Sequence, residues 1–135
     1  MSVLKRLVVC CGVLPVAMLL GACAPEDLPY QFDDLPAGDA QRGATLFGQS
    51  VNGAPACSTC HTLDGGAAAG PDLEGYGTVA MTRVRGQSAG EYTFYSILRP
   101  AKHIVRGYSN VMPADYARKL SAQDVADLIA YLLSL

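Results

Sequence analysis

The strongest constraint on the fold is a five-residue stretch, Cys57-Ser58-Thr59-Cys60-His61, in which two thiols lie three positions apart and an imidazole follows directly. This C-x-x-C-H pattern is the attachment signature of c-type haem. Its spacing lets Cys57 and Cys60 reach the two vinyl groups of one porphyrin and form thioether bonds, and it places His61 beneath the iron as an axial ligand. The sequence therefore predicts one covalent haem c, around which the rest of the chain folds.

Two other uses of the cysteine pair are open from the residues alone. A zinc site needs two more ligands at sensible spacing, and His103 is the one further histidine in the sequence. A redox-active dithiol of the thioredoxin type needs a strand and a helix around the pair, and no strand pattern competes with the helical ones here. Haem binding is favoured over both because the complete five-residue motif is present.

Helical patterns predict an all-α domain over residues 39–135. A first short helix is indicated by Ala40, Ala44, Leu46 and Phe47, with Asp39 near its N-terminus as a cap or dipole partner. A second helix is predicted over residues 91–98 and is ended by Pro100.

The last helix has the clearest signal. Ser121 is its expected cap and Asp124 occupies the capping-box position three residues later. One apolar face follows at helical spacing, formed by Val125, Leu128, Ile129, Leu132 and Leu133.

Residues 48–90 are rich in Gly, Ala, Ser and Pro and are expected to be mostly loop. Three to four short helices joined by such a loop make a poor core for a domain of this size. Small domains of this kind usually gain stability from disulfides, a metal or a cofactor. A large apolar prosthetic group would supply the missing core.

Residues 1–22 are predicted to be a cleaved export signal. Lys5 and Arg6 form a charged start, and the apolar run over residues 7–20 is shorter than the roughly 20 residues that span a bilayer. The run ends in Leu20-Gly21-Ala22-Cys23, which resembles the bacterial lipoprotein signal whose cysteine receives lipid and becomes the new N-terminus. Lipidation of Cys23 would hold the protein on the extracytoplasmic side of the cell membrane. An ordinary signal with an incidental cysteine is the alternative.

Cleavage before Cys23 would account for the odd number of cysteines. Of the five, Cys10 and Cys11 leave with the signal, Cys23 carries lipid, and the remaining pair binds haem, so none is left for a disulfide. The formal charge of −2 becomes −4, with eight basic and twelve acidic residues. This weakly acidic balance argues against a general nucleic-acid-binding protein.

Residues 23–38 are predicted to be the lipidated N-terminus followed by an extended linker that contains proline and acidic residues. An alternative is that the segment packs along the domain or a partner, with Tyr30 and Phe32 as the contacts.

Three side chains could supply the sixth ligand to a haem iron. Met112 is favoured because it lies 51 residues after His61 and immediately before Pro113, in a polar loop where a core methionine is not expected. Met81 lies only 20 residues after His61, too soon to pass around the porphyrin edge. His103 is the second candidate, although a surface or propionate-side position is the more ordinary one for it.

Residues 39–135 resemble the class I cytochromes c throughout. Gly43 and Phe47 resemble the glycine and aromatic residue of that family's first helix, and Leu128 and Tyr131 match the apolar pair of its last helix. The resemblance implies the class I fold, with its first and last helices crossing closely and its short helices wrapped around one haem. It also implies that the Pro71 carbonyl, in Gly70-Pro71-Asp72-Leu73, accepts a hydrogen bond from His61 and orients it, and that residues 107–113 form the methionine-ligand loop.

The resemblance implies a one-electron carrier, and not an enzyme acting on a small-molecule substrate. A lipid anchor and a single haem are similar to bacterial lipoprotein cytochromes of respiratory or photosynthetic chains, including the monohaem subunit of alternative complex III, a multisubunit quinol-oxidising complex. The expected partners are therefore redox proteins in the membrane, met either within such a complex or by a tethered shuttle. A haem peroxidase and a gas sensor, each with a labile sixth ligand, are the alternatives.

Basic residues outnumber acidic ones over residues 83–119. This imbalance could present a docking surface to an acidic partner, or it could be an ordinary solvated surface. The seven cations are Arg83, Arg85, Arg99, Lys102, Arg106, Arg118 and Lys119, against Glu91 and Asp115.

Overall fold

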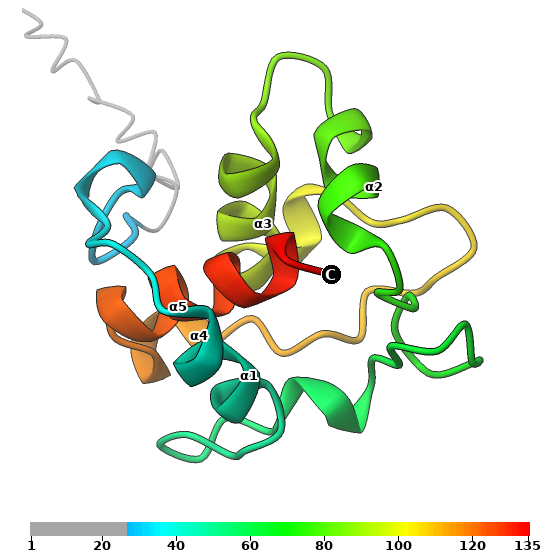
Figure 1. Ribbon diagram of the computed structural model, residues 1–135, viewed down its shortest axis with the longest axis horizontal. Helices are drawn as coiled ribbons and strands as arrows, with labels where there is room; N and C mark the ends of the chain where they lie inside the picture. The colour runs from blue at the N-terminus through cyan, green and yellow to red at the C-terminus, as the bar shows by residue number, and fades with distance from the viewer. Residues whose placement is uncertain (1–26) are drawn as a thin grey trace, which may run out of the picture.

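Helices carry the regular secondary structure of the domain (Figure 1). The computed structural model describes residues 27–135, so the predicted export signal and Cys23 lie outside the described residues. No strand occurs within residues 27–135, and the all-α prediction is confirmed. The longest helix in this range has 12 residues, and none is long and apolar enough to cross a bilayer. The helices are α1 (Ala40–Phe47), α2 (Tyr76–Arg83), α3 (Ala89–Leu98), α4 (Tyr116–Lys119) and α5 (Ala122–Leu133), with short 3₁₀ turns η1 (Phe32–Asp34), η2 (Cys57–Thr59) and η3 (Pro100–Lys102).

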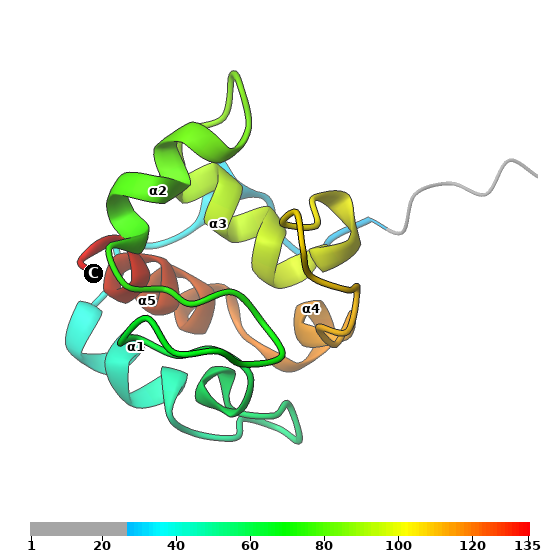
Figure 2. The ribbon, with the colours of Figure 1, turned by 90° about the vertical axis from the view of Figure 1, so that its right-hand side faces the viewer.

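The first and last of these α-helices, α1 and α5, cross in close contact (Figure 2). Gly43 makes the crossing possible, because a Cβ at this position would overlap the carbonyl oxygen of Asp127 and lie 2.7 Å from Cβ of Tyr131. Phe47 packs beside the contact, with its ring centroid 5.6 Å from that of Tyr131. The close crossing implied by the class I resemblance is therefore present.

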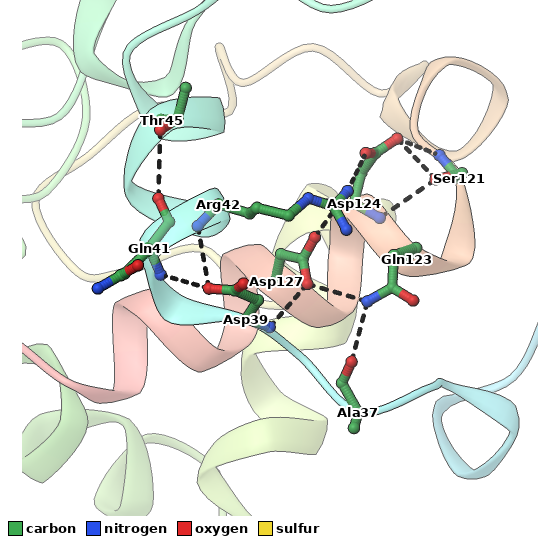
Figure 3. Close-up of polar contacts among 9 residues, drawn as sticks. All are labelled: Ala37, Asp39, Gln41, Arg42, Thr45, Ser121, Gln123, Asp124 and Asp127. Carbon is green, nitrogen blue, oxygen red and sulfur yellow. Dashed lines mark hydrogen bonds and ion pairs between the residues drawn. The ribbon is translucent and has the colours of Figure 1, made fainter.

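A buried carboxylate, Asp127 of α5, reinforces this crossing (Figure 3). Its Oδ1 accepts hydrogen bonds from the Asp39 backbone N–H at 2.7 Å and from the Gln123 side-chain amide at 2.9 Å. Its Oδ2 forms an ion pair with the Arg42 guanidinium at 3.0 Å. Gln123 also donates to the Ala37 carbonyl at 2.9 Å. One acidic side chain thus joins the start of α1 and the chain before it to α5.

The helices α1 and α5 both begin where the sequence predicts. The Asp39 side chain caps α1 by accepting hydrogen bonds from the backbone N–H groups of Gln41 and Arg42. Ser121 and Asp124 form a complete capping box at the start of α5. Four of the five apolar residues predicted for α5 are buried, and Leu133 is half-buried. They pack with Phe94 of α3, which is completely buried, into one core.

Two helices were not expected from the sequence. Most of residues 48–90 is loop, as predicted, but the helix α2 occupies residues 76–83 of that stretch. The second predicted helix, α3, begins at Ala89 rather than residue 91, and the Ser88 side chain caps it by accepting from the Glu91 N–H. The four-residue helix α4 forms between the predicted methionine loop and α5.

From residue 28 to α1 the chain packs on the domain, as the alternative interpretation expects, and is not an extended linker there, whereas residues 23–26 of the predicted segment lie outside the described residues. We call residues 28–38 the strap. Tyr30 donates a hydrogen bond from its hydroxyl to the Leu120 carbonyl at 2.9 Å. The rings of Tyr30 and Phe32 both pack against Phe94 in T-shaped pairs, at centroid distances of 6.2 and 5.9 Å. The strap therefore covers one side of the core.

Candidate haem-binding site

One largely apolar cavity gathers the predicted haem-binding residues. Its walls come from η2, the loop 61–75, α2, α3 and the loop that follows η3. The five residues singled out in residues 39–135 all line it, namely Cys57, Cys60, His61, Pro71 and Met112. Residues more than 50 positions apart in the sequence thus meet around one space.

The 3₁₀ turn η2 presents both cysteines to the cavity. Residues three apart eclipse each other in a 3₁₀ helix, so Cys57 and Cys60 lie on the same side of the turn. The turn is closed by hydrogen bonds from the N–H groups of Cys60 and His61 to the Cys57 carbonyl, at 3.1 and 3.0 Å. Burial raises the pKa of the Cys57 thiol above its ordinary value of 9.0.

His61 is held by the loop that follows it. Its Nδ1 lies 2.7 Å from the Pro71 carbonyl oxygen, which can only accept, so Nδ1 carries the proton. The other ring nitrogen, Nε2, is then the one with a free lone pair, as a metal ligand requires. The Gly70 N–H donates to the Cys60 carbonyl at 2.8 Å and brings Pro71 into place. Gly70 allows this approach, because a Cβ there would lie 2.6 Å from Cε1 of His61.

A second set of hydrogen bonds closes the same loop. The Leu73 N–H donates to the Thr62 carbonyl at 2.9 Å, and the Thr62 hydroxyl donates to the Asp72 carboxylate at 2.5 Å. This hydroxyl, together with the Glu74 N–H, holds the pKa of Asp72 below its ordinary value of 3.8. The loop that carries Pro71 is therefore fixed on both sides of the proline.

Met112 and His103 both line the cavity and are half-buried. The ring of His103 forms a T-shaped pair with Tyr92 of α3, with centroids 5.5 Å apart. Met81 lies on α2 with 61% of its surface exposed and is not among the cavity residues. Of the two methionines considered as ligands, the cavity therefore includes only Met112.

Several cavity residues were missed by sequence reasoning. Ser96 of α3 lines the cavity with a buried hydroxyl that has no hydrogen-bond partner among residues 27–135. Tyr76 and Tyr116 also line it, and burial raises the pKa of each to about 12. Their hydroxyls reach the Thr93 hydroxyl and the Pro55 carbonyl, both at 3.0 Å. No local motif marks these residues, because only the fold brings α3, α2 and the start of α4 to one space.

The predicted basic surface is divided between two places. Arg83 lines the haem cavity, whereas Arg99, Lys102 and Arg118 line a separate groove beside η3 and α4. Lys119 forms an ion pair with Asp115 at 2.8 Å.

An all-helical domain whose cavity wall carries two cysteines and a carbonyl-bonded histidine defines a protein that binds haem covalently. The family model described as Cytochrome c matches residues 40–135, and the chain belongs to the cytochrome c family. The protein accordingly holds haem c and is a haem-based electron carrier. The residues fit the group: the cavity is largely apolar, and His61 has one nitrogen bonded to Pro71 and the other free to coordinate.

Proposed function

We propose that Cys57 and Cys60 bind the haem through thioether bonds and that His61 and Met112 are its axial ligands. The observation that carries this proposal is the convergence of His61 and Met112 on the walls of one cavity, although they are 51 residues apart in the sequence. His61 is oriented by Pro71 at 2.7 Å. Met112 comes from the loop between η3 and α4, followed directly by Pro113.

With His61 and Met112 both bound to the iron, the haem would carry one electron at a time and no coordination position would remain for a substrate. The haem supplies the ferric–ferrous couple, and a methionine ligand in a buried site favours the reduced form. The chain contributes a rigid proximal loop and an apolar wall, which limit the rearrangement that accompanies each change of charge.

The location of the protein and its redox partners form a second part of the proposed function. We infer that Cys23 is lipidated after export and that the protein works on the extracytoplasmic face of the cell membrane. Its partners are redox proteins of a respiratory or photosynthetic chain, either in a quinol-oxidising complex like alternative complex III or in a shuttle to an oxidase or reaction centre. The lipoprotein-like sequence before Cys23 and the haem motif support this placement.

The ligand assignment is tested by spectroscopy of the purified holoprotein. Ferric protein should show the iron–methionine charge-transfer band, and ferrous protein should bind carbon monoxide only slowly. Met112→Ala should abolish the band, lower the reduction potential and open the site to carbon monoxide. Met81→Ala is the matched control and should change none of these. A spectrum unchanged by Met112→Ala would refute the assignment, and rapid carbon monoxide binding by the unmodified protein would favour a peroxidase or a gas sensor.

The membrane partners need a separate experiment. Membranes dissolved in a mild detergent should release the haem in a large complex if the protein is a permanent subunit. Release as a small lipidated protein would indicate the shuttle instead. Loss of membrane partitioning on Cys23→Ser would support the anchor.

A further inference from the structure

The first described residues lie at the edge of a groove. Asp27, the first described residue, lines the groove beside η3 and α4, together with Leu28 and Tyr30. Leu28 packs against the hydrophobic core, and Tyr30 is bonded to the Leu120 carbonyl. Residues 28–30 are therefore attached to the domain beside this groove.

The distance from there to Cys23 is short. Asp27 lies four positions after Cys23, and a fully extended chain spans at most about 3.3–3.6 Å per residue, or about 14 Å in all. A linker of the whole predicted segment, residues 23–38, would reach roughly 50 Å. The packing of the strap thus removes most of the tether, and a lipid on Cys23 would hold the groove close to the bilayer.

Among the described residues that line the same groove are three cations, Arg99, Lys102 and Arg118, and one carboxylate, Asp27. Lys102 is held over the ring of Tyr95, with Nζ 3.2 Å from the centroid. The chain as a whole has a formal charge of −2, whereas the described residues that line the groove carry two more positive than negative charges. Cations beside a bilayer are attracted to anionic headgroups and their phosphates.

We propose that the face formed by η3, α4 and residues 27–30, which we call the groove face, lies on the lipid bilayer, with Arg99, Lys102 and Arg118 toward the phosphates of anionic lipids. The inference rests on the proposed lipidation of Cys23. It makes the protein a carrier held in one orientation at the membrane surface, in place of one that swings on a long tether.

This orientation has a consequence for the haem cavity. Pro100 of η3 lines the groove on one side and the cavity on the other. The cavity wall formed by η3 is therefore also the wall nearest the bilayer.

Orientation is tested with the full-length, lipidated holoprotein in vesicles of phosphatidylcholine and phosphatidylglycerol. A fluorophore is attached at Ala101→Cys, an exposed position in the groove, or at Ala44→Cys, an exposed position on α1. In Figure 2, α1 lies at the opposite end from the point where the described chain starts. Quenchers carried on lipid headgroups should quench the Ala101 label several-fold more than the Ala44 label. Equal quenching of both labels would overturn the proposal and would leave the groove face to a protein partner.

The charge contribution is tested in the Cys23→Ser holoprotein, where binding to vesicles no longer depends on the lipid anchor. Each groove cation near an anionic surface should strengthen binding about fivefold at low salt. Lys102→Gln and Arg118→Gln should each weaken binding to anionic vesicles by about this factor. Arg85→Gln, an exposed cation of the α2–α3 loop that does not line the groove, should not. Equal effects of all three changes would overturn the electrostatic part of the proposal.

The experiment separates this inference from the function on which it rests. The mass of the purified protein shows whether Cys23 carries lipid, and an unmodified Cys23 would overturn the short-tether argument. The reduced haem spectrum and the midpoint potential report electron carriage, and neither depends on which face meets the bilayer. Failure of the orientation test with normal lipidation and a normal spectrum would therefore count against the groove face alone.

Discussion

The Pro71 carbonyl oxygen lies 2.7 Å from Nδ1 of His61, ten residues earlier in the chain. Gly70 makes that approach possible, because its missing Cβ leaves the space that the imidazole ring occupies. The orientation of the proximal histidine thus depends on a residue without a side chain as much as on the proline that follows it.

Gly70→Ala should therefore destabilise the holoprotein. The new Cβ would lie 2.6 Å from Cε1 of His61 and 3.0 Å from the Cys60 carbonyl oxygen, and neither the ligand ring nor the backbone can move freely. We expect the free energy of unfolding of the ferric protein to fall by about 1–3 kcal/mol, measured with guanidinium chloride. Gly66→Ala is the control, since the nearest atom to its Cβ is a carboxylate oxygen of exposed Asp64. Equal losses for both variants would contradict the explanation.

Gly43→Ala should be more damaging. Its Cβ would overlap the backbone carbonyl of Asp127, so α1 and α5 would have to move apart along the whole crossing. We expect a loss of about 3 kcal/mol or more, and a lower yield of protein with attached haem. Gly48→Ala, where the nearest atom to the Cβ is 3.8 Å away, should be close to neutral. A stable Gly43→Ala protein with normal haem content would show that the helices can separate at little cost.

How well each helix could be predicted from the sequence depends on whether its own residues include a cap and an apolar face. The α5 helix has a capping box and an apolar face, and α1 has an aspartate cap, so both begin where the sequence predicts. The α2 helix has neither, since Gly75 precedes it with φ of 62° and no side chain caps it. Only Ala80 is buried in it, so no apolar stripe marks it, and tertiary contacts with α3 and α5 determine that it forms.

The residues of the haem-binding site likewise differ in how well the sequence predicts them. Cys57, Cys60 and His61 are recognisable from their spacing alone. Pro71 required a family resemblance, because nothing local indicates that its carbonyl meets His61. Ser96 and Tyr116 enter the cavity only through long-range packing. The sequence left open whether the strap is a linker or packs on the domain. Its acidic, proline-containing composition favours a linker, whereas Tyr30 and Phe32 are the one indication of packing.

The strap should contribute measurably to stability. Phe32→Ala removes an edge contact with Phe94, and we expect the free energy of unfolding to fall by about 1–2 kcal/mol. Tyr30→Phe removes the hydrogen bond to the Leu120 carbonyl and should cost about 1 kcal/mol. Denaturant titrations of the holoprotein measure both, with Met81→Ala on the exposed face of α2 as the control. If the three variants unfold at the same denaturant concentration, the strap does not stabilise the domain.

Alkaline pH should weaken the fold through three tyrosines. Burial raises the pKa values of Tyr30, Tyr76 and Tyr116 from 10.0 to about 12. The folded protein then holds these protons more tightly than the unfolded chain does. Their contribution to stability is complete below pH 10 and is lost as the pH rises from 10 to about 12.

Tyrosinate absorbance and denaturant titrations across that range test the expectation. Tyr116→Phe should make the fall in stability with pH less steep, because one of the three protons no longer takes part. An unaltered slope in Tyr116→Phe would mean that this hydroxyl ionises normally in the folded protein.

The match to the family model begins at residue 40, but the folded unit begins earlier. A protein expressed from residue 40 would leave the buried Phe94 ring uncovered on the side of Tyr30 and Phe32, and Asp127 without the Asp39 N–H. Such a truncated protein would expose apolar surface, which favours self-association. A recombinant domain intended for study should therefore start at or before Leu28, since the boundary of homology and the boundary of folding differ by about a dozen residues.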